Sequence, residues 1–315
     1  MSADEKEIKN VAVMGSTGFV GYNTAKELVE HGLRVRALVR KGAEPKKISK
    51  LSRLGVEIIE VNYSRVEEIE EALRGCEAAY NFIGSSYQSV KENVYESNTQ
   101  MAINTVNASK GANVKLYIYN SGLGVNPQTT QSYFISKLRA ERIIRKSGLR
   151  YIIFRPSYII GYNDEFSEYI LKNASEGKPI PIYGSGKYRI QPVYIGDVVK
   201  IYALCISLRN NWMKTYDLVG EEIVCFSDYV EMLARSLTNK NPLLTYVELE
   251  QAYRDAMRQE SRRRHNRYLS VDELDVLISD FVSSPLRVKK DFGIKMTPLR
   301  QAIKEIVRAY LESKK

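Results

Sequence analysis

Short apolar runs alternate with amphipathic stretches through the first half of the chain. Apolar runs at 10–14, 34–39, 56–61, 78–83, 115–120 and 151–155 predict buried strands, and the stretches at 25–29, 48–54, 66–73, 94–109 and 132–146 predict helices. Strands that alternate with helices in this way form a parallel sheet through right-handed crossovers, with helices on both faces. The pattern therefore predicts an α/β fold of the Rossmann type, with a doubly wound parallel sheet.

The pattern becomes less regular after Pro156. The segment 177–184 is rich in turn residues, and helices are predicted at 198–207, 229–237, 247–264, 271–281 and 298–312. We expect a sheet domain over 1–160, with further sheet elements from about 190–220. A smaller, mainly helical domain is expected over 161–315, interleaved with the first.

Composition narrows the class of protein. Hydrophobic residues make up 44% of the 315 residues, which suits a packed core, and no apolar run is long enough to span a bilayer. The charged N-terminus lacks an apolar signal core, and three scattered cysteines with two histidines favour neither disulfides nor a metal site. We expect a cytoplasmic protein, or one peripheral to a membrane complex, that binds no metal.

The net charge is +10, from 47 Lys and Arg against 37 Asp and Glu. Much of this excess is expected on solvated helix faces. The densest basic cluster runs from Arg258 to Arg267 and includes Arg262, Arg263 and Arg264. An acidic protein or a membrane surface would suit it, whereas nucleic acid is not favoured because the cluster lacks interleaved aromatic residues.

A glycine motif, Gly15-Ser-Thr-Gly18-Phe-Val-Gly21, lies directly between the first predicted strand and the first predicted helix. Glycines at these spacings allow a tight turn, close approach of the backbone to a pyrophosphate, and tight packing of helix on sheet. We therefore expect a dinucleotide here, also contacted by the intervening residues Thr17, Phe19 and Val20.

The end of the second strand indicates which dinucleotide binds. It reads Leu38-Val39-Arg40-Lys41 and carries no carboxylate for the ribose hydroxyls, whereas an arginine suits a 2′-phosphate. NADP(H) is therefore favoured over NAD(H), which stays open. Asn62, after the third strand, is a candidate contact to the adenine.

A second motif, Tyr133-Phe-Ile-Ser-Lys137, lies on a predicted helix. The spacing of four places the phenol and the ammonium on one face, where Lys137 would lower the pKa of Tyr133 and bind ribose. Ser121 ends the preceding strand and could polarise a substrate carbonyl. These three residues are the candidate catalytic set.

Together these motifs resemble the extended branch of the short-chain dehydrogenase/reductase superfamily, the NAD(P)-dependent epimerase/dehydratase family. Further matching segments are Asn81-Phe-Ile-Gly84, Asn98, Arg155-Pro-Ser-Tyr-Ile-Ile-Gly161, Arg189-Ile-Gln-Pro-Val-Tyr-Ile-Gly-Asp197 and Asp291-Phe-Gly-Ile-Lys-Met-Thr-Pro-Leu299. Within the branch, the chain most resembles the subgroup that contains the accessory subunit of respiratory complex I.

The resemblance implies roles for individual residues. Gly15, Gly18 and Gly21 would hold the pyrophosphate, Arg40 would lie near the adenosine ribose, and Gly84 and Pro156 would contact the cofactor. Tyr133 would be the acid/base, tuned by Lys137, with Ser121 polarising the substrate.

Three further residues carry expectations of their own. Arg155 and Arg189 could clamp a substrate phosphate through paired hydrogen bonds, or could serve in structural ion pairs. Asp197 directly precedes an apolar helical run and is expected to cap that helix.

The chain departs from the family pattern after the strand that ends at Ser121. Enzymes of the branch often carry two hydroxyl residues here, whereas Gly122-Leu123-Gly124 follows Ser121 and supplies no acid for a dehydratase.

Three hypotheses of function follow. The first is an NADP(H)-preferring oxidoreductase or epimerase acting on a small hydroxylated substrate such as a nucleotide sugar, and it could form a homodimer. The second is a non-catalytic, nucleotide-binding structural or assembly subunit. The third, an RNA-binding member of the branch, is the least favoured.

Overall fold

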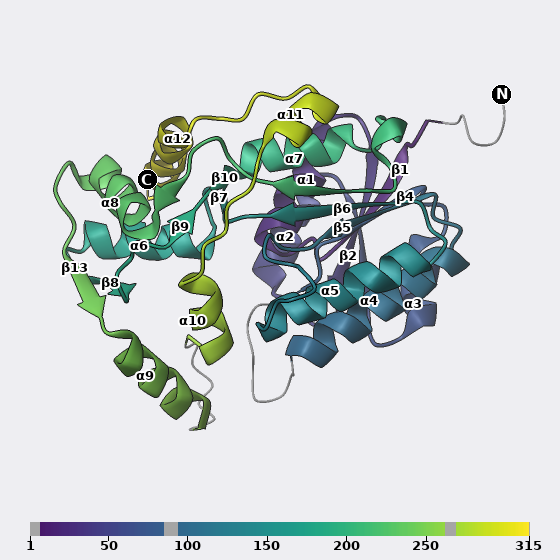
Figure 1. Ribbon diagram of the computed structural model, residues 1–315. Helices are drawn as coiled ribbons and strands as arrows, with labels where there is room; N and C mark the ends of the chain where they lie inside the picture. The colour runs from purple at the N-terminus through teal and green to yellow at the C-terminus, as the bar shows by residue number, and fades with distance from the viewer. Residues whose placement is uncertain (1–6, 85–93, 262–268, 315) are drawn as a thin grey trace.

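The computed structural model describes residues 7–84, 94–261 and 269–314 (Figure 1). Most of the basic cluster predicted at Arg258–Arg267, including Arg262, Arg263 and Arg264, lies outside the described residues.

A seven-stranded parallel sheet forms the centre of the molecule, in the order β11-β6-β5-β4-β1-β2-β3. This topology confirms the predicted doubly wound sheet. The order reverses between β1 and β4, which makes the carboxyl edge beside these two strands the expected position for a ligand. The strands are β1 (Asn10–Met14), β2 (Arg34–Arg40), β3 (Glu57–Val61), β4 (Ala78–Asn81), β5 (Leu116–Asn120), β6 (Tyr151–Pro156) and β11 (Lys214–Leu218).

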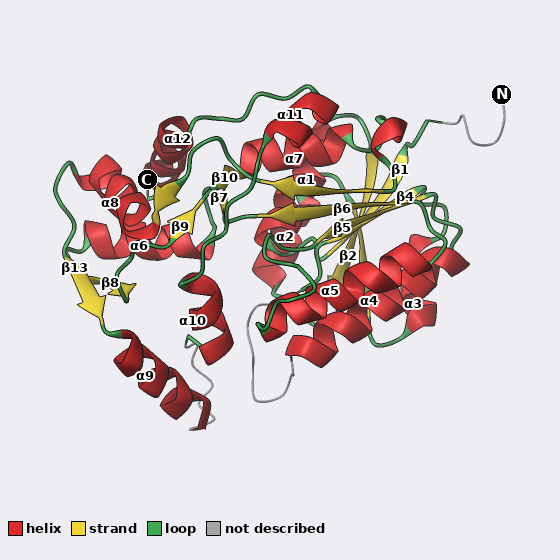
Figure 2. Cartoon of the chain, viewed as in Figure 1, coloured by secondary structure: helices red, strands yellow, loops and turns green. Residues whose placement is uncertain are grey.

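Helices cover both faces of this sheet, because its strands are apolar on both sides. Figure 2 shows one helical layer beneath the sheet and another above it. The first layer is α3 (Val66–Leu73), α4 (Val94–Gly111) and α5 (Ser132–Lys146). The opposite face packs against α1 (Phe19–Glu30), α2 (Pro45–Ser52) and α7 (Ile195–Leu204).

The C-terminal part has its own hydrophobic core, formed mainly by three helices (Figure 1). These are α6 (Glu165–Ser175), α8 (Phe226–Thr238) and α12 (Leu299–Glu312). Three short strand pairs join them: β7 (Ile159–Ile160) with β10 (Val193–Tyr194), β9 (Arg189–Ile190) with β12 (Val224–Cys225), and β8 (Ile180–Tyr183) with β13 (Leu244–Val247). The remaining helices are α9 (Leu249–Ser261), α10 (Val271–Leu277) and α11 (Leu286–Phe292).

Three predictions for this part were wrong in detail. The segment predicted as turns at 177–184 contains β8, and the helix predicted from residue 247 begins at Leu249, after β13. Pairing between β8 and β13 creates both strands, and neither run is long enough to reveal it locally. The helix predicted over 271–281 ends at Leu277, since Phe281 forms a bridge with Ile190 of β9 and the Asp280 carboxylate accepts from the backbone N–H of Arg189.

Asp197 does not cap the helix that follows it, as was predicted. The helix α7 already begins at Ile195, so Asp197 lies in its first turn. The Asp197 carboxylate instead accepts hydrogen bonds from the backbone N–H and the hydroxyl of Thr297, at 2.7 and 2.8 Å. This residue therefore ties α7 to the segment that leads into α12.

Within the described ranges, none of the helices combines the length and apolar character that crossing a bilayer requires.

Candidate functional site

The turn between β1 and α1 brings two backbone segments unusually close. Gly15 has φ of +78°, and a Cβ at this position would lie 3.0 Å from the carbonyl carbon of Phe82. A Cβ at Gly21 would lie 2.3 Å from the carbonyl oxygen of Gly15. Gly18 stands at the N-cap of α1, where no side-chain hydrogen bond covers the helix N–H groups. The turn therefore fits a pyrophosphate held at a helix N-terminus.

The other residues predicted around this turn have separate surroundings. Thr17 lies in the turn, Val20 packs against the core beneath α1, and Phe19 opens the helix. The Phe19 ring lies against Gly161, where a Cβ would come within 2.8 Å of its Cζ. The first turn of α1 thus contacts the segment that follows β6.

Polar groups gather at the ends of β2 and β3. Arg40 is exposed and makes no side-chain hydrogen bond or ion pair with the described residues. Lys41 pairs with Glu68 at 2.9 Å, and the Glu68 carboxylate also accepts from the backbone N–H of Asn62 at 3.0 Å. Sequence reasoning missed Glu68, because it lies on α3 and not at a strand end. Arg40 is therefore the cation left available near this end of the sheet.

Three residues of α5, one turn apart, form a polar stripe facing the sheet. These are Tyr133, Lys137 and Glu141. Lys137 is 3% exposed, and its Nζ donates a hydrogen bond to the carbonyl oxygen of Asn120 at 3.0 Å. The same Nζ stands beside Gly84, in the segment that follows β4. Burial lowers the pKa of Lys137 to about 8, although Glu141 opposes this shift.

The Tyr133 hydroxyl makes no hydrogen bond to the rest of the described chain. Burial raises the pKa of Tyr133 to about 12. The expectation that Lys137 lowers this pKa is not met, because the Lys137 Nζ lies 5.7 Å from the centre of the Tyr133 ring and is engaged with Asn120. Tyr133 is therefore a neutral phenol at physiological pH.

The Ser121 hydroxyl points away from this phenol. It donates to Oε1 of Glu141 at 2.7 Å, two helical turns beyond Tyr133 on α5. The Glu141 side chain is fully buried and also accepts from Arg155 and Arg145 at 2.6 and 2.8 Å. A carboxylate only accepts, so the single Ser121 proton is already committed. In the structure the Ser121 hydroxyl is therefore directed to Glu141 and not toward Tyr133.

Gly122 stands where a residue would face Tyr133. A Cβ at this position would lie 3.4 Å from Cε1 of Tyr133 and 3.1 Å from Cε1 of Phe134. Tyr133 is thus accompanied by Lys137 on its own helix but by no hydroxyl from the adjoining strand end.

Both arginines considered for a substrate phosphate are engaged in ion pairs. Arg155 donates through Nε and a terminal nitrogen to the two oxygens of Glu141, at 2.8 and 2.6 Å. Arg189 bonds Asp280 through its Nε, at 2.8 Å, and through its backbone N–H. The structure therefore favours the structural alternative for both residues.

Two other predicted positions contact the same edge of the sheet. Pro156 ends β6, and its carbonyl oxygen accepts from the backbone N–H of Leu123 at 2.9 Å. Asn98 of α4 donates to the Ser136 hydroxyl at 3.2 Å. Over the described part of the chain, no three His, Cys, Asp or Glu side chains gather as metal ligands.

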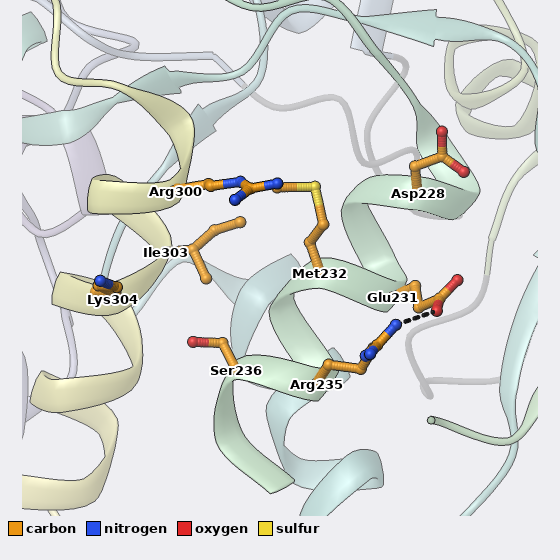
Figure 3. Close-up of a pocket in the computed structure, with 8 residues that line it drawn as sticks. All are labelled: Asp228, Glu231, Met232, Arg235, Ser236, Arg300, Ile303 and Lys304. Atoms are coloured by element: carbon orange, nitrogen blue, oxygen red, sulfur yellow. Dashed lines mark hydrogen bonds and ion pairs between the residues drawn. The ribbon is translucent and has the colours of Figure 1, made fainter. Parts of the chain in front are cut away.

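A charged groove of about 540 Å³ lies elsewhere, between α8 and α12 (Figure 3). Arg300 and Lys304 line its α12 wall, and Arg235 pairs with Glu231 on its α8 wall at 3.2 Å. None of the residues predicted for the site lines this groove.

The chain is similar in sequence to known subunits of mitochondrial NADH dehydrogenase. The chain is 24% identical over 306 residues to the mitochondrial NADH dehydrogenase [ubiquinone] 1 alpha subcomplex subunit 9 of Dictyostelium discoideum, covering 96% of this chain and 85% of that protein. It is also 24% identical to the mitochondrial NADH-ubiquinone oxidoreductase 40 kDa subunit of Neurospora crassa, covering 71% of this chain and 59% of that subunit.

The fold is shared with sugar-nucleotide enzymes. The structure of UDP-glucuronic acid 4-epimerase from Bacillus cereus, determined with UDP-glucuronic acid and NAD, superimposes with a TM-score of 0.77 at 14% identity, covering 97% of this chain and all of that one. These findings support the resemblance to the extended short-chain dehydrogenases near the complex I subunit. A family model described as NAD(P)H-binding matches residues 15–180, just over half of the chain, and the protein belongs to this NAD(P)H-binding family.

Proposed function

We propose that this protein holds NADP(H) as a firmly bound structural group within a protein assembly and does not turn it over. One observation carries the proposal: Gly122 stands against Tyr133, while the neighbouring Ser121 hydroxyl is committed to Glu141. A nucleotide site is thus retained beside a catalytic set that lacks its hydroxyl.

The binding residues fall into two groups along the carboxyl edge of the sheet. The turn at Gly15, Gly18 and Gly21 would hold the pyrophosphate at the N-terminus of α1. Lys137 would contact the nicotinamide ribose. Arg40, exposed and without a partner among the described residues, supports the choice of NADP(H), because a guanidinium suits a 2′-phosphate. Bound NADPH would supply a hydride, and reduction of a carbonyl would also need a group that donates a proton to its oxygen.

The high pKa of Tyr133 supports a site that does not catalyse a reaction. A general acid or base works best with a pKa near the operating pH, and burial holds the pKa of this phenol at about 12. A second hydroxyl beside it would stabilise charge developing on a substrate oxygen. Removal of one such donor costs about 10²–10³ in rate in other enzymes. Tyr133 with Lys137 alone would therefore support turnover only weakly.

The relatives support the role in an assembly. Both matched mitochondrial proteins are subunits of NADH dehydrogenase, and one of them aligns along almost the whole of this chain. We infer a similar position for this protein, as a subunit attached to a larger complex at a membrane.

The second candidate is an active oxidoreductase or epimerase. It is favoured by the Tyr133 hydroxyl, which has no partner in the described chain and could pass a proton to a substrate oxygen. In this alternative Tyr133 is the acid, and Lys137 holds ribose.

Exchange of bound NADPH separates the two candidates. The protein is loaded with NADPH, freed of excess nucleotide and chased with NADP⁺ while the fluorescence of bound NADPH is recorded. The structural role predicts slow exchange, with NADPH retained through gel filtration and still reduced. Exchange within the time of mixing, together with oxidation of the nucleotide by added carbonyl compounds, would support the enzyme instead.

A matched variant controls for binding at the predicted turn. Gly21→Ala introduces a methyl group against the Gly15 carbonyl oxygen and should abolish retention. If this variant retains NADPH as the natural chain does, the nucleotide is bound elsewhere and the proposal fails.

A further inference from the structure

An aromatic cluster packs between the Tyr133 end of α5 and the C-terminal part. The ring centres of Tyr133 and Phe134 lie 5.2 Å apart, those of Phe134 and Phe281 also 5.2 Å, and those of Phe281 and Tyr158 6.5 Å. Leu123, Val125 and Val219 are the other buried members, and Leu138 and Val276 pack against them. Phe134 and Phe281 are buried, whereas Tyr133 and Tyr158 are partly buried and form its edge.

Gly124 allows the two phenylalanine rings to meet. A Cβ at this position would lie 2.6 Å from ring atoms of both Phe134 and Phe281. The two rings come from parts of the chain far apart in sequence, so a residue larger than glycine would separate the sheet from the segment that follows α10. The contact between the two parts beside Tyr133 is thus apolar.

The two arginines near this cluster are held in ion pairs with carboxylates. Arg155 is paired with the buried Glu141, and Arg189 with Asp280, the residue next to Phe281. A diphosphate leaving water needs paired positive charge or hydrogen-bond donors. With both arginines engaged, a nucleotide sugar would find neither of them free.

One tyrosine hydroxyl at the cluster, and another in the neighbouring core of the C-terminal part, have no partner among the described residues. The buried hydroxyl oxygens of Tyr158, at the cluster, and of Tyr188, in the C-terminal core, make no hydrogen bond to the described residues, and the Tyr188 side chain is 8% exposed. Burial raises the pKa of both phenols, so both are neutral donors. Buried hydroxyls without partners carry a free-energy cost, and a ligand oxygen would relieve it.

We propose that the aromatic cluster binds an uncharged, largely apolar molecule whose carbonyl or hydroxyl oxygen pairs with Tyr158, and that a nucleotide sugar does not bind there. Because the rings are packed against each other in the structure, binding would require the Phe281 ring to move aside. This inference goes beyond the proposed function, because the site requires no turnover.

Binding of small fluorinated probes to the full-length, NADPH-loaded protein tests the proposal. ¹⁹F NMR titrations measure the dissociation constants of 4-fluorobenzyl alcohol and of fluorobenzene, which lacks the hydroxyl. UDP-glucose is added as a competitor. We expect both probes to bind, the alcohol more tightly, and UDP-glucose to displace neither.

Two variants, with a third as control, distinguish binding at this site from non-specific binding to apolar surface. Tyr158→Phe should weaken binding of the alcohol about 5- to 10-fold, which is the contribution of one neutral hydrogen bond, and should leave binding of fluorobenzene unchanged. Phe281→Ala should tighten binding of both probes by vacating space. Leu286→Ala, at an apolar side chain that is 69% exposed on α11, is the control and should change neither.

Several results would overturn the proposal. These are displacement of the probes by UDP-glucose, equal weakening of both probes by Tyr158→Phe, and failure of either probe to bind. NADPH fluorescence, recorded on the same samples, reports the nucleotide site separately, so failure of the proposed function is not confused with failure of this site.

Discussion

Replacement of Glu141 by alanine is expected to destabilise the protein strongly. Glu141 is fully buried and accepts hydrogen bonds from Ser121, Arg155 and Arg145. The variant would leave the half-buried Arg155 guanidinium without its counter-charge and the Ser121 hydroxyl without its acceptor. Removing one partner of a buried ion pair costs about 3–5 kcal/mol. Because the Arg155 side chain is still 23% exposed, we expect a loss near the lower limit, about 3 kcal/mol.

The loss should depend on pH with a definite sign. Burial opposes ionisation of Glu141, but hydrogen bonds from Arg155 and Ser121 hold its pKa below the ordinary value of 4.5. A carboxyl group whose pKa is lower in the folded chain contributes stability above the unfolded pKa and loses it as the pH falls through the folded value. The natural chain and Glu141→Ala should therefore differ fully at pH 7 and converge progressively below about pH 4.5.

Urea unfolding followed by circular dichroism at several pH values measures both effects. Glu141→Gln keeps an acceptor oxygen for Ser121 but removes the charge, and we expect it to show an intermediate loss. A loss of less than about 1 kcal/mol in the free energy of unfolding of Glu141→Ala at pH 7, the range of an exposed ion pair, would refute a buried, stabilising role for Glu141. A difference between the two proteins that grew toward acid pH would refute it as well.

Three further predictions concern the nucleotide and the phenol. Gly21→Ala should prevent NADPH binding in fluorescence titrations while its thermal unfolding stays cooperative, and normal binding would show that the turn is not the nucleotide site. Arg40→Ala should weaken binding of NADPH about 10-fold or more, because a charge-assisted contact to the 2′-phosphate is lost, and should leave binding of NADH nearly unchanged. Equal weakening of both nucleotides would contradict the 2′-phosphate assignment. The absorbance difference between the natural chain and Tyr133→Phe should show a phenol that titrates near pH 12, and a titration below pH 9 would mean that Lys137 activates Tyr133 after all.

The sheet could be predicted from the sequence because its strands are buried on both faces. Such strands appear as continuous apolar runs, and the glycine motif marks the first turn between strand and helix. The short strands β8 and β13 could not be predicted in this way. They exist because they pair with each other across a sequence separation of about sixty residues, and nothing local distinguishes them from turns.

The candidate site was predictable in its residue types but not in their directions. Ser121 and Gly122 are adjacent, and successive side chains at a strand end point to different sides, so the sequence could not say which one faces Tyr133. The partner of Arg189 lies 91 residues away in sequence, at Asp280. Ion pairs that depend on the folded path of the chain leave no signal in residue spacing.

A single-turnover experiment tests the central claim most directly, namely that the nucleotide is held and not used. NADPH bound to the natural chain, to Tyr133→Phe and to Gly122→Ser is challenged with a panel of carbonyl compounds, and its oxidation is followed by absorbance. We predict that the natural chain and Tyr133→Phe oxidise NADPH equally slowly, and that only Gly122→Ser, which places a hydroxyl beside Tyr133, gains rate. Oxidation by the natural chain that Tyr133→Phe abolishes would contradict the account and identify an active enzyme.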